Sequence, residues 1–202
     1  MWNKIQKIYI GSNLVRPTKY EYSYDFRNKT TTQLANDWWT NTSWLTTGAN
    51  WVTASSWTVI FNQASWLWTA MANAKKLTMQ MLMYDNGSSS SWSTAWLTLT
   101  TGTDAYTQTW FYTDNSNVWA ICGSWTETIK KSQTVYNTKW DYTLTAEYDF
   151  VNKILSVNFP SVYSWTAALT DSNITVAKTN NTVRCPIQTD RYIKTIYVLV
   201  KY

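Results

Sequence analysis

The sequence predicts an all-β protein, built as one antiparallel β-sandwich with a short N-terminal strand or arm. Thr, Ser, Asn, Tyr and Trp are abundant in its 202 residues and only 14% of the residues are charged, a composition that favours strands over helices. Short runs with alternating polar and apolar residues recur between turn residues, and no run shows convincing helical periodicity. The length suits a single domain with a core of its own.

The first 18 residues are expected to form a separate strand or attachment arm. Lys4–Ile10 has the composition of a strand and Gly11–Asn13 that of a turn. Pro17 has no backbone N–H and therefore blocks further ladder pairing. We expect an arm over residues 1–18 and a sandwich domain over residues 19–202.

Lys19–Phe26 gives the strongest strand signal. Tyr20, Tyr22, Tyr24 and Phe26 alternate with polar residues, which is the period-2 pattern of a strand with one buried face. The three tyrosines are therefore assigned to core or sheet-face packing in preference to ligand contact.

Leu77–Tyr84 is predicted as a core strand in the same way. Met79, Met81 and Met83 alternate with other residues, and this spacing favours methionines that pack in the core over methionines that bind a ligand.

Further strands are expected between turn residues along the chain, giving roughly eleven or twelve in total, as in a jelly roll. They are Trp57–Phe61, Ala95–Thr100, Ala105–Tyr112, Asn117–Cys122, Glu127–Val135, Asp141–Phe150, Lys153–Phe159, Ile174–Ala177 and Tyr192–Tyr202. The best helix candidate is one turn at Thr31–Asp37.

One local motif occurs twice, as YDFRNK at residues 24–29 and YDFVNK at residues 148–153. Both copies have the pattern of a strand end that enters an Asn-Lys turn. The two copies indicate a reused strand-turn element and not a tandem repeat of whole domains.

Charge and residue usage exclude several functions. The formal charge is +5, but the basic residues are scattered and pair only at Lys75-Lys76 and Lys130-Lys131, so no nucleic-acid partner is expected. Histidine is absent, which excludes Ser-His-Asp triads and His metal sites. We expect no cofactor and no resident metal.

The two cysteines and the N-terminus bear on the compartment. Cys122 and Cys185 either form one disulfide or remain two buried thiols. No secretory signal peptide and no run of 18 apolar residues is visible, so we expect no membrane insertion. A location on a virion or an extracellular surface would then be reached by assembly or lysis.

Three stretches resemble the concanavalin A-like lectin/glucanase jelly roll. They are EYSYDFRNKT, WDYTLTAEYDFVNKILSV and the closing YIKTIYVLVKY. The opening KIYIGSNLVRPTK is similar to a short leader in tail and other virion proteins of bacterial viruses, with Tyr9, Arg16 and Pro17 among the matching residues. The resemblance implies a tail or surface protein whose sandwich binds a cell-surface glycan or a neighbouring virion protein.

The acidic residues do not reproduce the catalytic E-x-D-x-E strand of the glucanases. Glu147 and Asp149 lie at i and i+2 on one predicted face, but the third carboxylate is missing, so an enzyme is not expected and a glycan hydrolase is the third choice. The structural interpretation of Asp149 is a carboxylate that caps the turn ahead of Asn152. Asp85-Asn86-Gly87 would supply oxygen ligands to calcium, but such a tripeptide is more often only a turn.

Tryptophan usage is the most unusual feature. The chain has 15 Trp and 5 Gly, although a protein with many turns needs glycine. Six tryptophans directly follow serine: Trp44, Trp57, Trp66, Trp92, Trp125 and Trp165.

Two explanations for the tryptophans remain open. Either some rings stack on sugars, with Trp92, Trp125 and Trp165 as candidates beside Asp85 and Asn86, or many positions are glycines encoded by a reassigned UGA codon. Substituting Gly gives turn-like stretches such as NDGWT at residues 36–40. The second explanation predicts that several tryptophans are exposed or have positive φ, whereas Trp2 and Trp140 have the sequence context of genuine tryptophans.

The sequence therefore predicts a non-enzymatic, lectin-like binding protein of a virion. Its partners would be a cell-surface glycan or neighbouring virion proteins, and it would form a homo-oligomer. The alternative is a structural or assembly protein that uses strand edges and its N-terminal arm, with Tyr9, Arg16 and Pro17 in the attachment segment.

Overall fold

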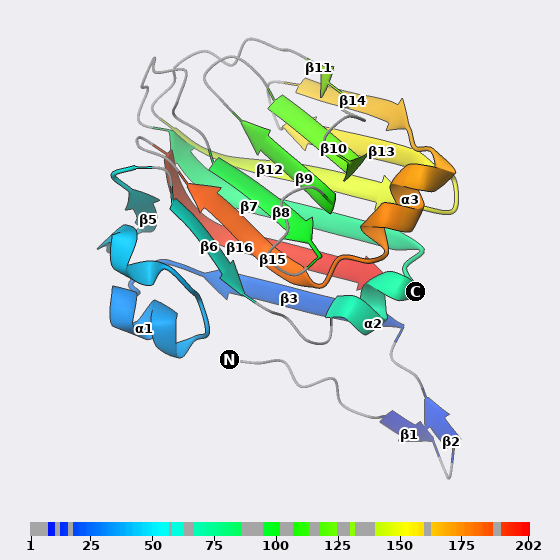
Figure 1. Cartoon of the computed structure of the whole chain (residues 1–202), viewed down its shortest axis with the longest axis horizontal. Helices are drawn as coiled ribbons and strands as arrows, with labels where there is room; N and C mark the ends of the chain where they lie inside the picture. The colour runs from blue at the N-terminus through cyan, green and yellow to red at the C-terminus, as the bar shows by residue number, and fades with distance from the viewer. Residues whose placement is uncertain are drawn as a thin grey trace.

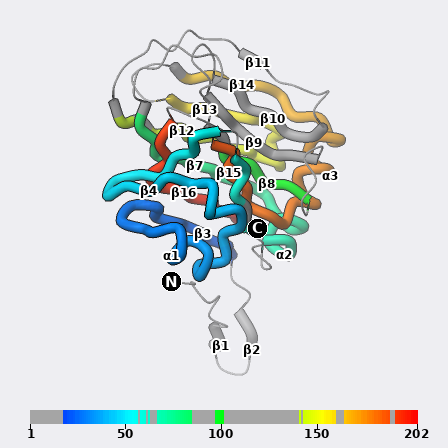
Figure 2. Tube along the Cα trace, turned by 60° about the vertical axis from the view of Figure 1, so that its left-hand side comes forward, coloured from blue at the N-terminus to red at the C-terminus, as the bar shows by residue number. Residues whose placement is uncertain are grey.

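The computed structural model describes residues 8–10, 13–15, 18–56, 58–62, 67–85, 95–101, 107–113, 118–124, 130–131, 140–159, 163–187 and 191–202. These residues form a sandwich of two antiparallel sheets (Figure 1). In both views β8 (Ala95–Thr100) and β15 (Thr182–Ile187) lie across β7 (Lys76–Asp85) and β16 (Arg191–Lys201) (Figures 1 and 2). The predicted all-β jelly-roll sandwich is confirmed.

The smaller sheet has six strands in the order β11-β10-β9-β8-β15-β6. Its other members are β6 (Thr58–Asn62), β9 (Thr107–Thr113), β10 (Val118–Ser124) and β11 (Lys130–Lys131).

The larger sheet has eight strands, in the order β14-β13-β12-β7-β16-β5-β4 with β3 also paired to β16. Its other members are β3 (Lys19–Asp25), β4 (Leu45–Gly48), β5 (Trp51–Ala54), β12 (Trp140–Asp149), β13 (Ile154–Phe159) and β14 (Tyr163–Ala168).

The core lies between the two sheets. On β7, Met79, Met81 and Met83 are fully buried, so the packing role predicted for them is confirmed. Tyr20 on β3 is also buried, and burial raises the pKa of its phenol to about 12. Cys185 on β15 is a free, buried thiol, which excludes the predicted alternative of a disulfide with Cys122.

The N-terminal strands pair apart from the sandwich sheets. β1 (Ile8–Ile10) and β2 (Asn13–Val15) form a two-stranded sheet of their own. The predicted strand at Lys4–Ile10 overlaps β1, and its remaining residues lie outside the described ones. The division into an arm at 1–18 and a domain at 19–202 stays a prediction.

Helix α1 (Thr31–Asn36) matches the single turn predicted at this place. Thr30 begins it with a capping box, in which its hydroxyl accepts from the Gln33 N–H while the Gln33 side chain accepts from the Thr30 N–H. These two bonds satisfy backbone donors that the first turn of a helix leaves free.

Helix α3 (Asp171–Ala177) corrects the strand predicted at Ile174–Ala177. Thr170 and Asn173 form the same kind of capping box as in α1, and Asp171 adds a negative charge to the first turn, where it interacts favourably with the helix dipole. Of the β-branched residues that suggested a strand, Ile174 is buried together with Ala177 on one side of the helix, whereas Thr175 is exposed.

Several other elements were not predicted. Helix α2 (Leu67–Ala72) buries Leu67, Ala70 and Met71. Strands β4 and β5 lie in a segment whose polar, Trp-containing sequence gave no strand signal, and β14 and β15 were also missed. The structure therefore has more strands than predicted, but the long strands β7, β12 and β16 match their predicted ranges closely.

Candidate functional site

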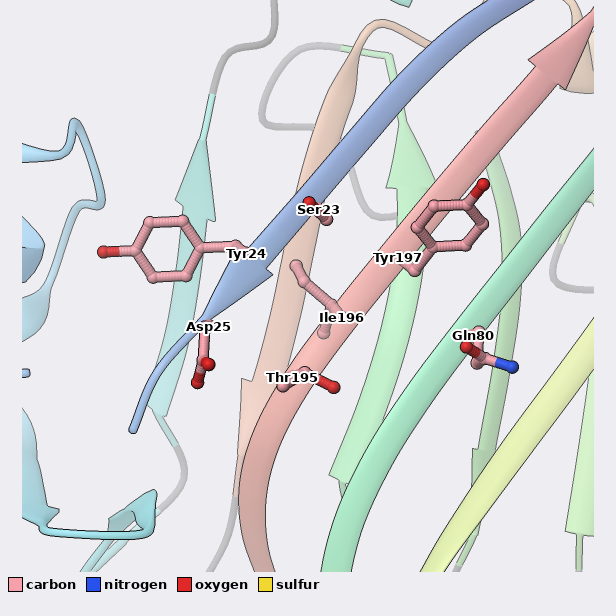
Figure 3. A pocket seen from close by; sticks show the side chains of 7 residues that line it. All are labelled: Ser23, Tyr24, Asp25, Gln80, Thr195, Ile196 and Tyr197. Carbon is pink, nitrogen blue, oxygen red and sulfur yellow. The ribbon is translucent and has the colours of Figure 1, made fainter. Parts of the chain in front are cut away.

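A depression of about 370 Å³ lies on the face of the larger sheet that points away from the core. Strands β3, β16 and β7 line it side by side (Figure 3). Its lining residues are Ser23, Tyr24, Asp25, Gln80, Thr195, Ile196 and Tyr197. Strand alternation places the polar side chains of Ser23, Asp25 and Gln80 on this face, because adjacent residues of a strand point to opposite faces. Tyr24 and Ile196 also line the depression, although both pack against the core.

A row of residues crosses four strands at the depression. Tyr197 lies opposite Ser23 on β3 and opposite Gln80 on β7, and Gln80 lies opposite Thr145 on β12. The Gln80 amide nitrogen donates to the Thr145 hydroxyl at 3.1 Å. This bond orients the amide on the sheet surface beside the Tyr197 ring (Figure 3).

Tyr197 is held by a short chain of polar contacts. Its hydroxyl donates to Glu21 Oε1 at 3.0 Å, and Lys19 Nζ lies 2.8 Å from Glu21 Oε2. The hydrogen bonds from Lys19 and Tyr197 lower the pKa of Glu21. Burial and the bond to Glu21 raise the pKa of Tyr197, so the phenol stays neutral and donates this hydrogen bond.

Asp25 contributes a negative charge at one end of the depression. Arg27 donates to both of its carboxylate oxygens, at 2.9 Å from Nε and 2.7 Å from a terminal nitrogen. This contact lowers the pKa of Asp25. The ring of Tyr24 extends away from Tyr197 in Figure 3, and its hydroxyl donates to Asp37 at 2.6 Å.

Three aromatic rings form a second patch on the same sheet face. Tyr84 is four residues from Gln80 on β7 and therefore shares its face. Tyr192 lies opposite Tyr84, with ring centroids 5.8 Å apart, and Trp51 packs edge-on against Tyr192 at 4.7 Å. Lys194 Nζ lies 5.8 Å from the Tyr84 centroid and 2.6 Å from Asp141 Oδ2. All three rings are partly exposed.

These features offer the contacts that a sugar needs. Ser23, Thr195 and Gln80 provide hydrogen-bonding groups for hydroxyls, and half-exposed aromatic rings provide apolar faces with a polar tip. Among the described residues, no group of three or more His, Cys, Asp and Glu side chains is placed to hold a metal ion.

Most predicted site residues are not placed by the structure. Trp92, Trp125, Asn86, Arg16 and Pro17 lie outside the described residues. Asp85 and Tyr9 lie in β7 and β1, but their side chains are outside the described part.

Trp165 is placed, and its position differs from the predicted one. Its side chain is only 5% exposed on β14 and belongs to the core. Trp165 was a candidate for stacking on a sugar, but Tyr163–Ala168 forms a strand whose alternation turns residue 165 inward. The ring therefore presents no face to a surface ligand.

The Glu147 and Asp149 carboxylates also have clear positions. Asp149 accepts from the backbone N–H groups of Val151 and Asn152 at 3.1 and 2.9 Å and pairs with Lys76 at 2.7 Å. The predicted turn-capping role is confirmed. Glu147 is exposed on the sheet face and accepts from the Thr78 hydroxyl.

Sequence reasoning missed the depression itself. The alternation in Lys19–Phe26 correctly assigned Ser23 and Asp25 to the polar face, but it held no information on which strand lies beside β3. The side-by-side arrangement of β3, β16 and β7 brings together residues that are more than 100 positions apart, and no local pattern encodes it.

Comparison with known proteins shows the fold class. No protein-family model and no curated protein matches the sequence. Among solved structures, the chain is similar to peanut lectin (TM-score 0.56, 8% identity, covering 91% of this chain and 97% of the lectin). It is also similar to the metal-free lectin I-B4 of Griffonia simplicifolia (TM-score 0.58, 10% identity, 89% and 98% covered).

A protein from a bacterial virus has a similar structure as well. A carbohydrate esterase from a Shiga toxin-encoding bacteriophage matches with a TM-score of 0.51 and 12% identity, covering 90% of each chain. The fold is thus a concanavalin A-like jelly roll, as the sequence motifs predicted. None of the described helices is long and apolar enough to cross a membrane.

Proposed function

We propose that this protein is a non-enzymatic binding protein of a virion tail or surface, and that it recognises a cell-surface carbohydrate. The observation that carries the proposal is the depression beside Tyr197, where hydroxyl, amide and carboxylate groups surround an oriented aromatic side chain. This combination suits a sugar, whose hydroxyls need hydrogen-bonding partners while its ring face needs an apolar surface.

The comparisons support the ligand class by analogy alone. Two of the similar structures are lectins by name, but a shared fold does not establish a shared function. The virion role rests on the N-terminal resemblance, and the similarity to a bacteriophage protein agrees with it.

An enzyme fits the described residues less well than a binding protein. The bacteriophage relative in structure is a carbohydrate esterase, and the sequence offered Glu147 and Asp149 as a carboxylate pair. The Asp149 carboxylate already binds two backbone N–H groups and Lys76, so it is committed to the turn. Acid-base catalysis needs both groups directed at one substrate.

The alternative function is assembly with copies of this chain or with other virion proteins. The observation that favours it is the two-stranded sheet of β1 and β2, which pairs with neither sheet of the sandwich. Such a segment is suited to contact a neighbour, because backbone pairing at strand edges is a common way for chains to associate.

A glycan screen followed by calorimetric titration tests the proposal. Tyr197→Ala and Gln80→Ala should each weaken binding of a glycan hit about tenfold, because each removes a contact worth roughly 1–2 kcal/mol. Ser156→Ala is the matched control, since Ser156 faces outward on β13 of the same sheet, outside the depression.

Two results would contradict the proposal. One is equal loss of affinity in the Ser156→Ala control and the depression variants. The other is a glycan screen without hits. In that case, self-association of the full chain in sedimentation experiments would favour the assembly role.

A further inference from the structure

The C-terminus of helix α1 has the hydrogen bonds of a Schellman motif. The N–H of residue 38 donates to the Ala35 carbonyl at 3.1 Å, and the N–H of Trp39 donates to the Leu34 carbonyl at 3.0 Å. With Asp37 as the C-cap, these are the 5→2 and 6→1 bonds that satisfy the last carbonyls of a helix. Residue 38 is therefore at the C′ position.

This position requires a left-handed backbone. Residue 38 has φ 69°, and glycine is the residue most often found at C′ because it has no Cβ to clash there. The other described non-glycine residues with positive φ are Asn28, Asn41 and Lys153. Asparagine tolerates this region well, whereas a bulky residue there is an outlier.

The tryptophan side chain at residue 38 makes little buried contact that would offset the strain of this backbone. It is 69% exposed, while the adjacent Trp39 is only 2% exposed and packs against Tyr24 and Phe26 at 5.3 and 5.2 Å. Trp39 and Leu34 are the C″ and C3 residues, whose contact usually accompanies the motif, and both are buried. The motif is thus complete without a side chain at residue 38.

The composition also suggests that tryptophan stands where glycine is expected. The chain has 15 Trp and only 5 Gly, and Trp38, Trp44 and Trp68 are exposed over 60% or more of their surface. UGA and the tryptophan codon UGG differ by one base. If the host inserts glycine at UGA but the gene is translated with UGA as tryptophan, the resulting sequence has Trp at each of those glycine positions.

We infer that residue 38 is glycine in the protein as its host makes it, encoded by a UGA codon that the host reads as glycine. The neighbouring Trp39 is a genuine tryptophan, because its ring fills the core at the end of α1. This inference is independent of the carbohydrate site, whose depression contains no tryptophan.

The coding DNA and three variants test the inference. We expect UGA at codon 38 and UGG at codon 39. Trp38→Gly should raise the folding equilibrium constant about five- to thirtyfold, which corresponds to relief of the left-handed strain. Trp38→Ala removes the same indole but keeps a Cβ, so it should be clearly less stable than Trp38→Gly, and Trp39→Gly should lose stability.

Either of two results overturns the inference. UGG at codon 38 would show that tryptophan is encoded there. A Trp38→Gly variant no more stable than Trp38→Ala, measured by urea denaturation of the full chain, would show that the backbone does not need glycine at C′.

Discussion

The two YDFxNK turns share five of their six residues and begin in the same way. Each Phe is buried, and each donates its N–H to the carbonyl of a lysine at 2.9 Å: Phe26 to Lys194 and Phe150 to Lys75. Each preceding Asp accepts from the N–H two residues later, at 2.9 Å from Arg27 and 3.1 Å from Val151. The motif thus fixes a capped strand end with a phenylalanine in the core.

The turns then diverge. In the first, Asn28 adopts φ 57° and its N–H donates to the Ala49 carbonyl at 3.0 Å, after which the chain enters α1. In the second, the left-handed residue is Lys153, with φ 56°, and the chain forms the β12–β13 hairpin. Identical residues therefore fix the buried anchor of each turn, whereas the tertiary partner determines where the chain goes next.

Removing the anchoring rings should have the largest effect. Phe26→Ala and Phe150→Ala should each destabilise the fold by about 3–5 kcal/mol, as expected for deletion of a buried aromatic side chain. Phe26 should cost more, since it contacts the rings of Tyr24 and Trp39 at 4.8 and 5.2 Å while Phe150 has Tyr148 at 6.4 Å. Urea denaturation measures both, and a larger loss for Phe150→Ala would contradict this ranking.

Removing the capping carboxylates should destabilise the fold by different amounts at the two turns. Asp149→Ala should cost about 1–2 kcal/mol, because it frees two backbone N–H groups, whereas Asp25→Ala should cost less than about 1 kcal/mol because its main partner is the exposed Arg27. Equal losses in urea denaturation at neutral pH would contradict the difference.

The Asp149 carboxylate should also make the stability of the fold depend on pH. The hydrogen bond from the Asn152 backbone and the contact with Lys76 lower the pKa of Asp149 in the folded protein. Its contribution is therefore complete above the unfolded pKa of about 4 and is lost as pH falls through the folded pKa. Asp149→Ala should flatten the decline in stability below about pH 4, and an unchanged decline would contradict this assignment.

Exchanging the left-handed residues should have the smallest effect. Lys153→Asn should stabilise the protein by about 0.5 kcal/mol and Asn28→Lys should destabilise it by a similar amount, because asparagine tolerates positive φ better than lysine. Lys153 also pairs with Asp171 at 2.9 Å. The variant is therefore best compared in an Asp171→Asn background, and destabilisation by Lys153→Asn there would contradict the expectation.

Local patterns predicted much of the fold. The alternation in β3 and β7 predicted which residues are buried, since adjacent side chains on a strand point to opposite faces. The same reasoning failed at Ile174–Ala177, where β-branched residues suggested a strand but the capping box at Thr170 starts a helix. The prediction that Trp165 is a candidate for stacking on a sugar was also wrong, because its ring is buried on β14.

The candidate site was less predictable than the fold. The polar face of β3 was visible in the sequence, but Tyr197 and Gln80 had no signal of their own. They belong to the site because β16 pairs with both β3 and β7. Strand neighbours are chosen by packing across the whole sandwich, so the composition of a sheet face depends on topology.

Local sequence patterns were enough to predict the all-β class, the buried faces of the long strands, the capped turn at Asp149 and the anomaly in tryptophan usage. These features depend on residues within a few positions of one another, whose backbone preferences act locally. The tertiary packing determines which strands adjoin at the depression, that Trp165 is buried, and that Trp39 fills the core between Tyr24 and Phe26. Such outcomes depend on contacts between segments far apart in the chain. These contacts stabilise the protein only once the strands have paired and the two sheets have packed.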